Sequence, residues 1–453
     1  MEKLNLVVTP YIEKLSKLSC ENNNIKPEMY VEHKVFRGLR DLDGNGVVTG
    51  LTEISDIKAK ELNEKGELVP CKGQLFYRGI DVTSLTDGFM RDNRFGFEET
   101  VYLLLFSKLP NKRELKDFCD LLSSLRYLPQ YFFRDMIMKA PGNDMMNIIA
   151  RSVLALYAYD PNPDDISVQN VLSQCLYLIS VFPLLSVYSY QSFEHFFNEN
   201  SLNIHNPDPS LSTSQNILHI LRGKDNYSDL EAKILDLALV LHAEHGGGNN
   251  STFATHVVTS SGTDTYSAIA AALGSLKGPR HGGANIKVVK MFEDMKNSIN
   301  TKDKSQIKDY LAKLLDKQAF DGSGLIYGMG HAIYSVSDPR SEVLKVCAQK
   351  LAQEKGYDDE YELYQTVSVL APQIISSKRK MYKGVSANVD FYSGLVYKML
   401  ELPGELYTPI FAMSRIAGWS AHRIEEIQNN GKIIRPTYVS VKNNQDYKFL
   451  SER

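Results

Sequence analysis

Helical periodicity is the feature that most constrains the fold of this chain. Between Asp303 and Gln318, apolar residues recur at the i, i+3, i+4, i+7 and i+8 positions of one helical face, whereas strand-like alternation is scarce along the sequence. End signals predict two more helices: one follows Asp264 and stops at Gly278, and one begins at Asp338-Pro339 and stops at Gly356. The pattern predicts an all-α protein.

Length and local texture predict two domains. A chain of 453 residues, 43% of them apolar, exceeds what one hydrophobic core usually serves. Residues 285–390 form short, lysine-rich amphipathic segments, whereas the flanking regions contain longer uncharged apolar stretches. We therefore expect a large helical domain, residues 1–284 and 391–453, into which a small helical domain, residues 285–390, is inserted.

One apolar segment has the length of a membrane span. Residues 166–193 carry no charge, but they include amides, several serines and Pro183. This composition favours a buried, proline-interrupted helix in a globular core, so no membrane association is expected.

The charge and the cysteine content of the chain limit which binding partners and which cellular compartment we expect. The net charge is -3 and no run of like charges is present, so a nucleic-acid partner is not expected. Five widely spaced cysteines, none in a Cys-x-x-Cys pair, indicate a reducing compartment without disulfides. Residues 1–19 contain Glu2 and Glu13 and fit no targeting signal, and we expect a cytoplasmic protein.

Two motifs could suggest a metal. Residues 41–46 resemble the start of a calcium-binding loop, but Thr52 stands where that loop needs a glutamate, so a simple turn is favoured. His242 and His245 are one helical turn apart, without the spacing of familiar zinc hydrolases. No metal is expected; a metal-dependent hydrolase built on these two residues and His256 is kept as a remote alternative, and a non-catalytic helical scaffold as another.

Three reactive side chains lie at loop-to-helix junctions, two of them among glycines. His281 lies in the segment 278–285, just before a predicted helix, where an imidazole tends to stay neutral and to donate a hydrogen bond. His331 ends the segment Gly328-Met329-Gly330-His331, and Asp390 leads an apolar helix after Asn388. Taken singly, each histidine could merely satisfy a turn, and Asp390 could be an ordinary N-cap.

Three arginines, Arg340, Arg415 and Arg435, complete the set of candidates. Arginine binds carboxylates in a bidentate manner, so three arginines converging on one cleft would suit a small di- or tricarboxylate. Each alone could instead be a surface ion pair.

In content, order and spacing, these segments resemble the citrate synthase family. The resemblance is carried by Leu241 to His245, Gly278 to Asn285, Gly328 to His331, Asp338 to Arg340, Asn388 to Gly394 and Arg435-Pro436, with Tyr77-Arg78-Gly79 near the front. It implies an almost entirely helical fold of a large and a small domain, with the active site in the cleft between them.

The resemblance also implies roles for single residues. It assigns hydrogen bonding of the acetyl-CoA thioester oxygen to His281, removal of a methyl proton to Asp390, and protonation of the oxaloacetate carbonyl oxygen to His331. Oxaloacetate would be held by further basic residues, which are His245, Arg340, Arg415 and, from the partner subunit of a homodimer, Arg435. The backbone of residues 325–330, with Leu325, Ile326, Gly328 and Gly330, would bind CoA.

The implied reaction makes citrate and free CoA, with acetyl-CoA as a substrate and no cofactor. The related 2-methylcitrate synthase, which uses propionyl-CoA, is the nearest alternative, because one methylene in an apolar pocket is worth only about 1–3 kcal/mol. The chain departs from the family pattern at Glu244 and Gly246, where many members have Asp and Glu.

Overall fold

The computed structural model describes residues 6–41, 46–331, 333–378 and 384–453. Two compact units are present: residues 1–49 with 434–453, and residues 50–433. The four residues at the centre of the calcium-like motif, 42–45, lie outside the described residues. The predicted division into domains 1–284/391–453 and 285–390 lies mostly within the second unit and stays a prediction.

The first unit contains little regular structure. Its elements are α1 (Pro10–Glu21), α2 (Pro27–Glu32) and a single terminal turn at Leu450–Glu452. The described residues 429–449, which follow the last long helix, form no helix or strand, in agreement with the extended tail that the sequence predicts.

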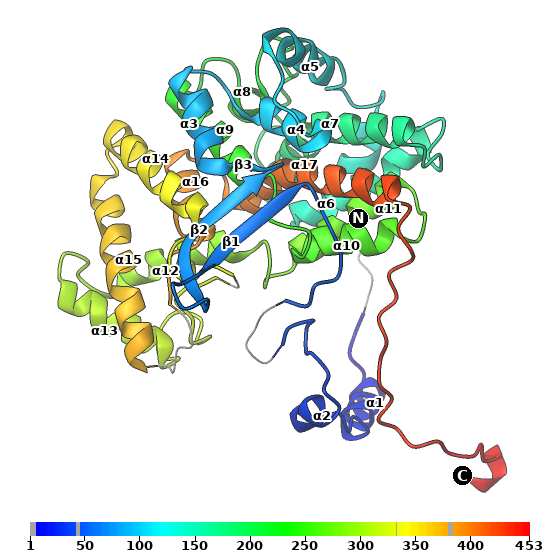
Figure 1. The fold of residues 1–453 in the computed structure, drawn as a ribbon. Helices are drawn as coiled ribbons and strands as arrows, with labels where there is room; N and C mark the ends of the chain where they lie inside the picture. Colours follow the sequence, from blue (N-terminus) through cyan, green and yellow to red (C-terminus); the bar gives the residue numbers. More distant parts are fainter. Residues whose placement is uncertain (1–5, 42–45, 332, 379–383) are drawn as a thin grey trace. The chain divides into compact units, whose positions relative to one another are not determined.

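The second unit is built mainly of helices (Figure 1). Those before residue 245 are α3 (Val82–Arg91), α4 (Phe97–Phe106), α5 (Lys112–Ser124), α6 (Met145–Leu156), α7 (Val168–Phe197), α8 (Thr213–Arg222) and α9 (Asp229–His242). Those after it are α10 (Asn250–Thr259), α11 (Thr265–Lys277), α12 (Ala284–Ser298), α13 (Lys304–Leu315), α14 (Pro339–Lys355), α15 (Asp358–Lys378), α16 (Val389–Met399) and α17 (Tyr407–Gln428). The all-α prediction is confirmed for the bulk of the unit.

The predicted helix ends are confirmed. Asp264 caps α11, and its side chain accepts a 2.8 Å hydrogen bond from the Ser267 N–H. Asp338 caps α14 with Pro339 as the first helical residue, and Gly356 ends that helix with φ +72°. In α13 the apolar face that the sequence predicts is buried, except for Leu315 at its edge, which is half-buried.

The core is organised around α7 and α17, which pack against each other. Among the described residues, α7 is the one helix that is long and apolar enough to span a membrane. However, 83% of its most apolar window is buried inside the structure. Pro183 lies inside it, as the sequence predicts. α17 also packs against α4, α9, α10 and α11, and its residues from Pro409 to Glu425 are all buried.

A small antiparallel sheet was not predicted. Its strands, in the order β1-β2-β3, are β1 (Ser55–Leu62), β2 (Leu68–Tyr77) and β3 (Ile80–Asp81). The pairing register of β1 and β2 shifts between Lys58 and Lys60, and Lys60 lies opposite Pro70 of β2. Such an irregularity is one of the places where a proline is tolerated in a central strand. The sequence shows no clean alternation here, because the bulge and the proline interrupt it.

The sheet fixes the segment that follows α9. Tyr77, at the end of β2, is fully buried, and its hydroxyl lies 3.0 Å from the Val240 carbonyl oxygen and 3.1 Å from that of Glu244. The Glu244 N–H also donates to this hydroxyl, at 3.3 Å. Because the Tyr77 hydroxyl carries one proton, it donates to one of the two carbonyl oxygens at a time while it accepts from the Glu244 N–H.

Tyr77→Phe is expected to lower the free energy of unfolding by about 1–3 kcal/mol, because it leaves buried backbone groups without a partner. Urea denaturation followed by circular dichroism measures the change. Tyr438→Phe is the matched control, because Tyr438 is 92% exposed and should be neutral. Equal stability of the two variants would contradict the role given to Tyr77.

Candidate active site

Six of the seven predicted catalytic and oxaloacetate-binding residues belong to the second unit. His245 follows α9, His281 precedes α12, His331 precedes α14, Arg340 lies in α14, Asp390 in α16 and Arg415 in α17. Arg435 belongs to the first unit, where it is exposed in the extended segment after α17.

His245 and His331 lie side by side. Their ring centroids are 5.1 Å apart, and the ring of Tyr334 stacks on His331 at 4.8 Å. Burial and the nearby charge of Arg340 hold the pKa of His245 well below its usual range, so its imidazole is neutral. Its Nε2 is buried and has no hydrogen-bond partner among the residues described.

The backbone fixes the tautomer of His331. Its Nδ1 accepts the N–H groups of Ile333, at 3.1 Å, and Tyr334, at 3.2 Å. A nitrogen that accepts two hydrogen bonds carries no proton, so the ring proton is on Nε2. His331 therefore presents Nε2–H as a donor.

Asp390 is not the cap of its helix. Asn388 caps α16 instead, accepting from the Asp390 N–H at 3.0 Å, so the ordinary N-cap interpretation of Asp390 is wrong. Burial raises the pKa of Asp390 to about 6, while the charges of Arg340 and Arg415 oppose this. The carboxylate is thus available as a base of unusual strength for an aspartate.

Two backbone segments are joined between His331 and Asp390. Met329 pairs with Ala387 in an antiparallel bridge, the Gly330 N–H donates to the Ser386 carbonyl at 2.8 Å, and the Asn388 N–H donates to the Gly328 carbonyl at 2.9 Å. Gly328 has φ +79°, and a Cβ there would lie 2.8 Å from the Phe391 ring. Only glycine fits this close approach.

Arg340 is held by Asp338. The Nε and Nη2 groups of Arg340 donate to the two carboxylate oxygens of Asp338, at 3.0 and 2.7 Å, and both side chains are buried. Asp338 also accepts from the Val389 N–H at 3.2 Å. One carboxylate therefore fixes the arginine and the first turn of α16, which carries Asp390. This second role of Asp338 was not visible in the sequence, where it reads only as a helix cap.

Arg415 is a buried cation with unused donors. Its Nε donates to the His242 carbonyl at 2.6 Å, and its guanidinium lies 4.8 Å from the Phe411 ring centroid. Nη1 and Nη2 are buried without a hydrogen-bond partner in the described parts of the chain. Burial lowers the pKa of Arg415 to about 10, since a desolvated charge is costly. An anionic ligand with two oxygens would satisfy both amino groups.

His281 contacts a residue that sequence analysis missed. Its Nε2 lies 3.1 Å from the hydroxyl of Ser251, which accepts the indole N–H of Trp419 at 3.1 Å. Burial and the charge of Arg415 lower the pKa of His281 to about 4. The predicted neutral state of the His281 imidazole is supported. Its largest cause is burial, rather than the helix N-terminus that the sequence suggested. No sequence signal marked Ser251, because the contact joins residues thirty positions apart.

The predicted CoA-binding segment is partly exposed. Leu325 is 47% exposed, whereas Ile326 is buried. Gly330 has φ +88° and open space around its α-carbon. The CoA assignment stays a prediction.

The histidines do not form a cluster suited to a metal. His242 lies in the core against the Phe411 ring. The two ring nitrogens of His256 face Glu426 and His422. In residues 6–41, 46–331, 333–378 and 384–453, no group of three His, Cys, Asp or Glu side chains is arranged to hold a metal ion.

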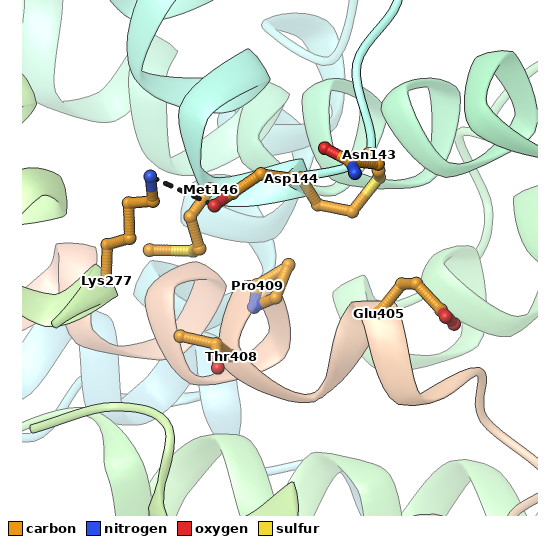
Figure 2. Close-up of a pocket in the computed structure, with 8 residues that line it drawn as sticks. Asn143, Asp144, Met146, Lys277, Glu405, Thr408 and Pro409 are labelled. Atoms are coloured by element: carbon orange, nitrogen blue, oxygen red, sulfur yellow. Dashed lines mark ion pairs between the residues drawn. The ribbon is translucent and has the colours of Figure 1, made fainter. Parts of the chain in front are cut away.

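A separate cavity of about 200 Å³ lies beside Lys277, the last residue of α11. Figure 2 shows its wall, with the 2.9 Å ion pair between Lys277 and Asp144 on one side and Thr408 and Glu405 below. The Thr408 hydroxyl donates to the Gly282 carbonyl at 3.1 Å. None of the predicted catalytic residues lines this cavity.

Comparison with known proteins gives one family. The model of the citrate synthase C-terminal domain matches residues 41–437. The chain is 34% identical to citrate synthase of Synechocystis sp., covering 84% of this chain and 88% of that protein. It is also 32% identical to 2-methylcitrate synthase of Shewanella oneidensis, covering 81% and 89%.

Solved structures agree. The ternary complex of carboxymethyl coenzyme A and oxaloacetate with citrate synthase from Thermoplasma acidophilum has a TM-score of 0.74 at 26% identity, covering 92% of this chain and 99% of that one. Citrate synthase from Pyrobaculum aerophilum has a TM-score of 0.71 at 28% identity, covering 90% and 94%.

Proposed function

Because the chain belongs to the citrate synthase family, we propose that it condenses acetyl-CoA with oxaloacetate and water to give citrate and free CoA. The observation that carries this proposal is a buried aspartate of raised pKa, Asp390, within the electrostatic reach of two buried arginines, Arg340 and Arg415. Such a site suits a base acting beside a small polycarboxylate.

In the proposed mechanism Arg340, Arg415 and His245 bind the carboxylates of oxaloacetate. The Nη groups of Arg415 and the Nε2 of His245, which have no hydrogen-bond partner among the described residues, support this assignment. Filling them with substrate oxygens removes the cost of an unpaired buried charge, which makes binding favourable.

Asp390 takes a proton from the methyl group of acetyl-CoA, and the electrons of that C–H bond form the enol or enolate. His281 donates to the thioester oxygen, where negative charge develops. A neutral donor is needed here, and the low pKa of His281 supplies it.

The new carbon–carbon bond forms between the enol carbon and the oxaloacetate carbonyl carbon. His331 gives its Nε2 proton to the carbonyl oxygen, which becomes the hydroxyl of the product. Before the next cycle Asp390 releases the proton it has taken and His331 takes one up, so the protons balance. Water then hydrolyses the thioester and releases CoA. The backbone of Leu325 to Gly330 is proposed to bind CoA; no cofactor takes part, and a cytoplasmic location is supported by five free cysteines.

The purified protein is expected to release CoA thiol from acetyl-CoA and oxaloacetate without added metal. The kcat/KM values for acetyl-CoA and propionyl-CoA, measured with a thiol reagent, decide between citrate and 2-methylcitrate synthesis. The Shewanella relative makes the second substrate a specific alternative. Asp390→Asn, prepared in parallel, controls for contaminating enzymes. Absence of thiol release with both thioesters would refute the proposal.

The pH profile should show the base. With the pKa of Asp390 raised to about 6, the carboxylate is protonated at lower pH, and kcat/KM should fall about tenfold for each pH unit below that value. Circular dichroism at each pH verifies that the fold is intact. A profile that stays flat to pH 5 would contradict the assignment of Asp390 as the base.

We further propose that Arg435 serves the active site of the other subunit of a homodimer. It is exposed in an extended segment with few apolar anchors, and such a segment can cross a two-fold interface. Its guanidinium would add a third cation for the substrate carboxylates.

Mixing two inactive variants tests this. His281→Ala and Arg435→Ala are dissociated, combined and reassembled; half of randomly formed dimers are hybrids with one complete site of two, so about a quarter of the unmodified activity should return. Each variant reassembled alone is the control. If Arg435 acts within its own chain, no activity above these controls appears.

A further inference from the structure

The ring of Tyr334 contacts both of the imidazoles that lie side by side in the site. It stacks on the ring of His331, with centroids 4.8 Å apart and an angle of 27° between the planes, and it meets the ring of His245 edge to face at 5.6 Å. Tyr334 is fully buried. One aromatic side chain therefore touches the proposed proton donor and a proposed ligand of oxaloacetate.

The strand β2 contacts the same ring through Gly73. A Cβ at Gly73 would lie 2.6 Å from Cδ1 and 2.8 Å from Cε1 of Tyr334, and it would overlap the Ser337 carbonyl oxygen. The Gly73 N–H donates to the Ser337 Oγ at 3.3 Å. No side chain fits at this point of the strand unless the neighbouring segment shifts, so Tyr334 rests directly on the backbone of the sheet.

Hydrogen bonds alone leave the His331 ring free to tilt. Its Nδ1 accepts the N–H groups of Ile333 and Tyr334, which fixes the tautomer but holds only one edge of the imidazole. Rotation of an imidazole about its χ2 torsion is soft, so a ring held at one edge can change its plane. The stacked ring of Tyr334 restricts this rotation and thereby fixes the direction in which Nε2–H points.

The hydroxyl of Tyr334 takes no part in this contact. It is buried without a hydrogen-bond partner among the described residues. A buried hydroxyl that lacks a partner gives no net stability. The aromatic ring is therefore the part of the side chain that the site uses.

Direction matters because a general acid must lie within hydrogen-bond reach of the atom that it protonates. We propose that Tyr334 is a positioning residue: resting on Gly73 of β2, its ring holds the imidazole plane of His331 so that Nε2–H points at the carbonyl oxygen of bound oxaloacetate. This inference rests on the proposed reaction, in which His331 is the acid.

The test compares Tyr334→Phe, which keeps the ring, with Tyr334→Leu, which removes it. Release of CoA thiol at saturating substrates gives kcat, and calorimetry gives the Kd for oxaloacetate. Tyr334→Phe should keep kcat within about twofold, because the lost hydroxyl has no partner. Tyr334→Leu should lower kcat by about ten- to a hundredfold, which is part of what a well-placed acid contributes. The Kd should rise no more than about threefold in either variant, because Arg340 and Arg415 still bind the carboxylates.

Tyr188→Leu is the matched control for lost packing. Tyr188 is a buried tyrosine of α7 whose ring lies against Phe133. The same substitution there should lower Tm but leave kcat unchanged, which separates a weakened core from a misdirected His331.

Gly73→Ala tests the part played by the sheet. Its methyl group should displace the Tyr334 ring and lower kcat by about tenfold, the size of effect that a small misplacement of a catalytic group produces. Gly88→Ala is the control, because a Cβ at Gly88 in α3 would meet nothing within 4 Å, and it should keep the unmodified kcat. If Tyr334→Leu does not fold, Tyr334→Phe and Gly73→Ala decide together.

An unchanged kcat in Tyr334→Leu would overturn the inference. Equal losses of kcat in Tyr334→Phe and Tyr334→Leu would also overturn it, because the hydroxyl would then be the acting group. Turnover of the unmodified protein distinguishes the two proposals. If the unmodified protein releases no CoA, the proposed reaction is refuted and this inference with it; if it is active and Tyr334→Leu is equally active, the inference alone is refuted.

Discussion

The buried guanidinium of Arg415 is the constraint on which the site depends. It is anchored through Nε to the His242 carbonyl, and it carries two amino groups without partners in the described chain. An unpaired buried cation is expensive, so the surrounding structure must be rigid enough to hold it in place. α17, packed against α7, α9, α10 and α11, supplies that rigidity. An anionic ligand that accepts from both amino groups offsets this cost, which makes the site selective for charge.

The second anchor is Asp338, which contacts both an arginine proposed to bind the substrate and the helix that carries the proposed base. Its carboxylate binds the Arg340 guanidinium and the Val389 N–H at the start of α16. The backbone bridge between Met329 and Ala387 then couples the His331 loop to the same helix start. The proposed acid and the proposed base are thus supported by one connected set of short contacts, and a shift in either segment is transmitted to the other.

Local signals in the sequence predicted the helix ends at Asp264 and Asp338-Pro339, because such caps act within a few residues. The sheet was missed, since Pro70 and the bulge near Lys58 disrupt its alternation. The candidate residues were found through a family resemblance rather than through spacing. Ser251 was not found, because its contact with His281 joins segments that are far apart in the chain.

The contact between Gly418 and Glu244 has a consequence for how such a sequence can change over generations. The helix position and the acid are complementary in size: no side chain fits at 418 while the longer acid reaches over it at 244. A Cβ at Gly418 would overlap Glu244 Oε2, and the backbone carbonyl oxygen of Ala243 would lie 2.5 Å from the same Cβ, so shortening the acid would not by itself admit a methyl group. Position 418 is therefore restricted to glycine whichever residue stands at 244.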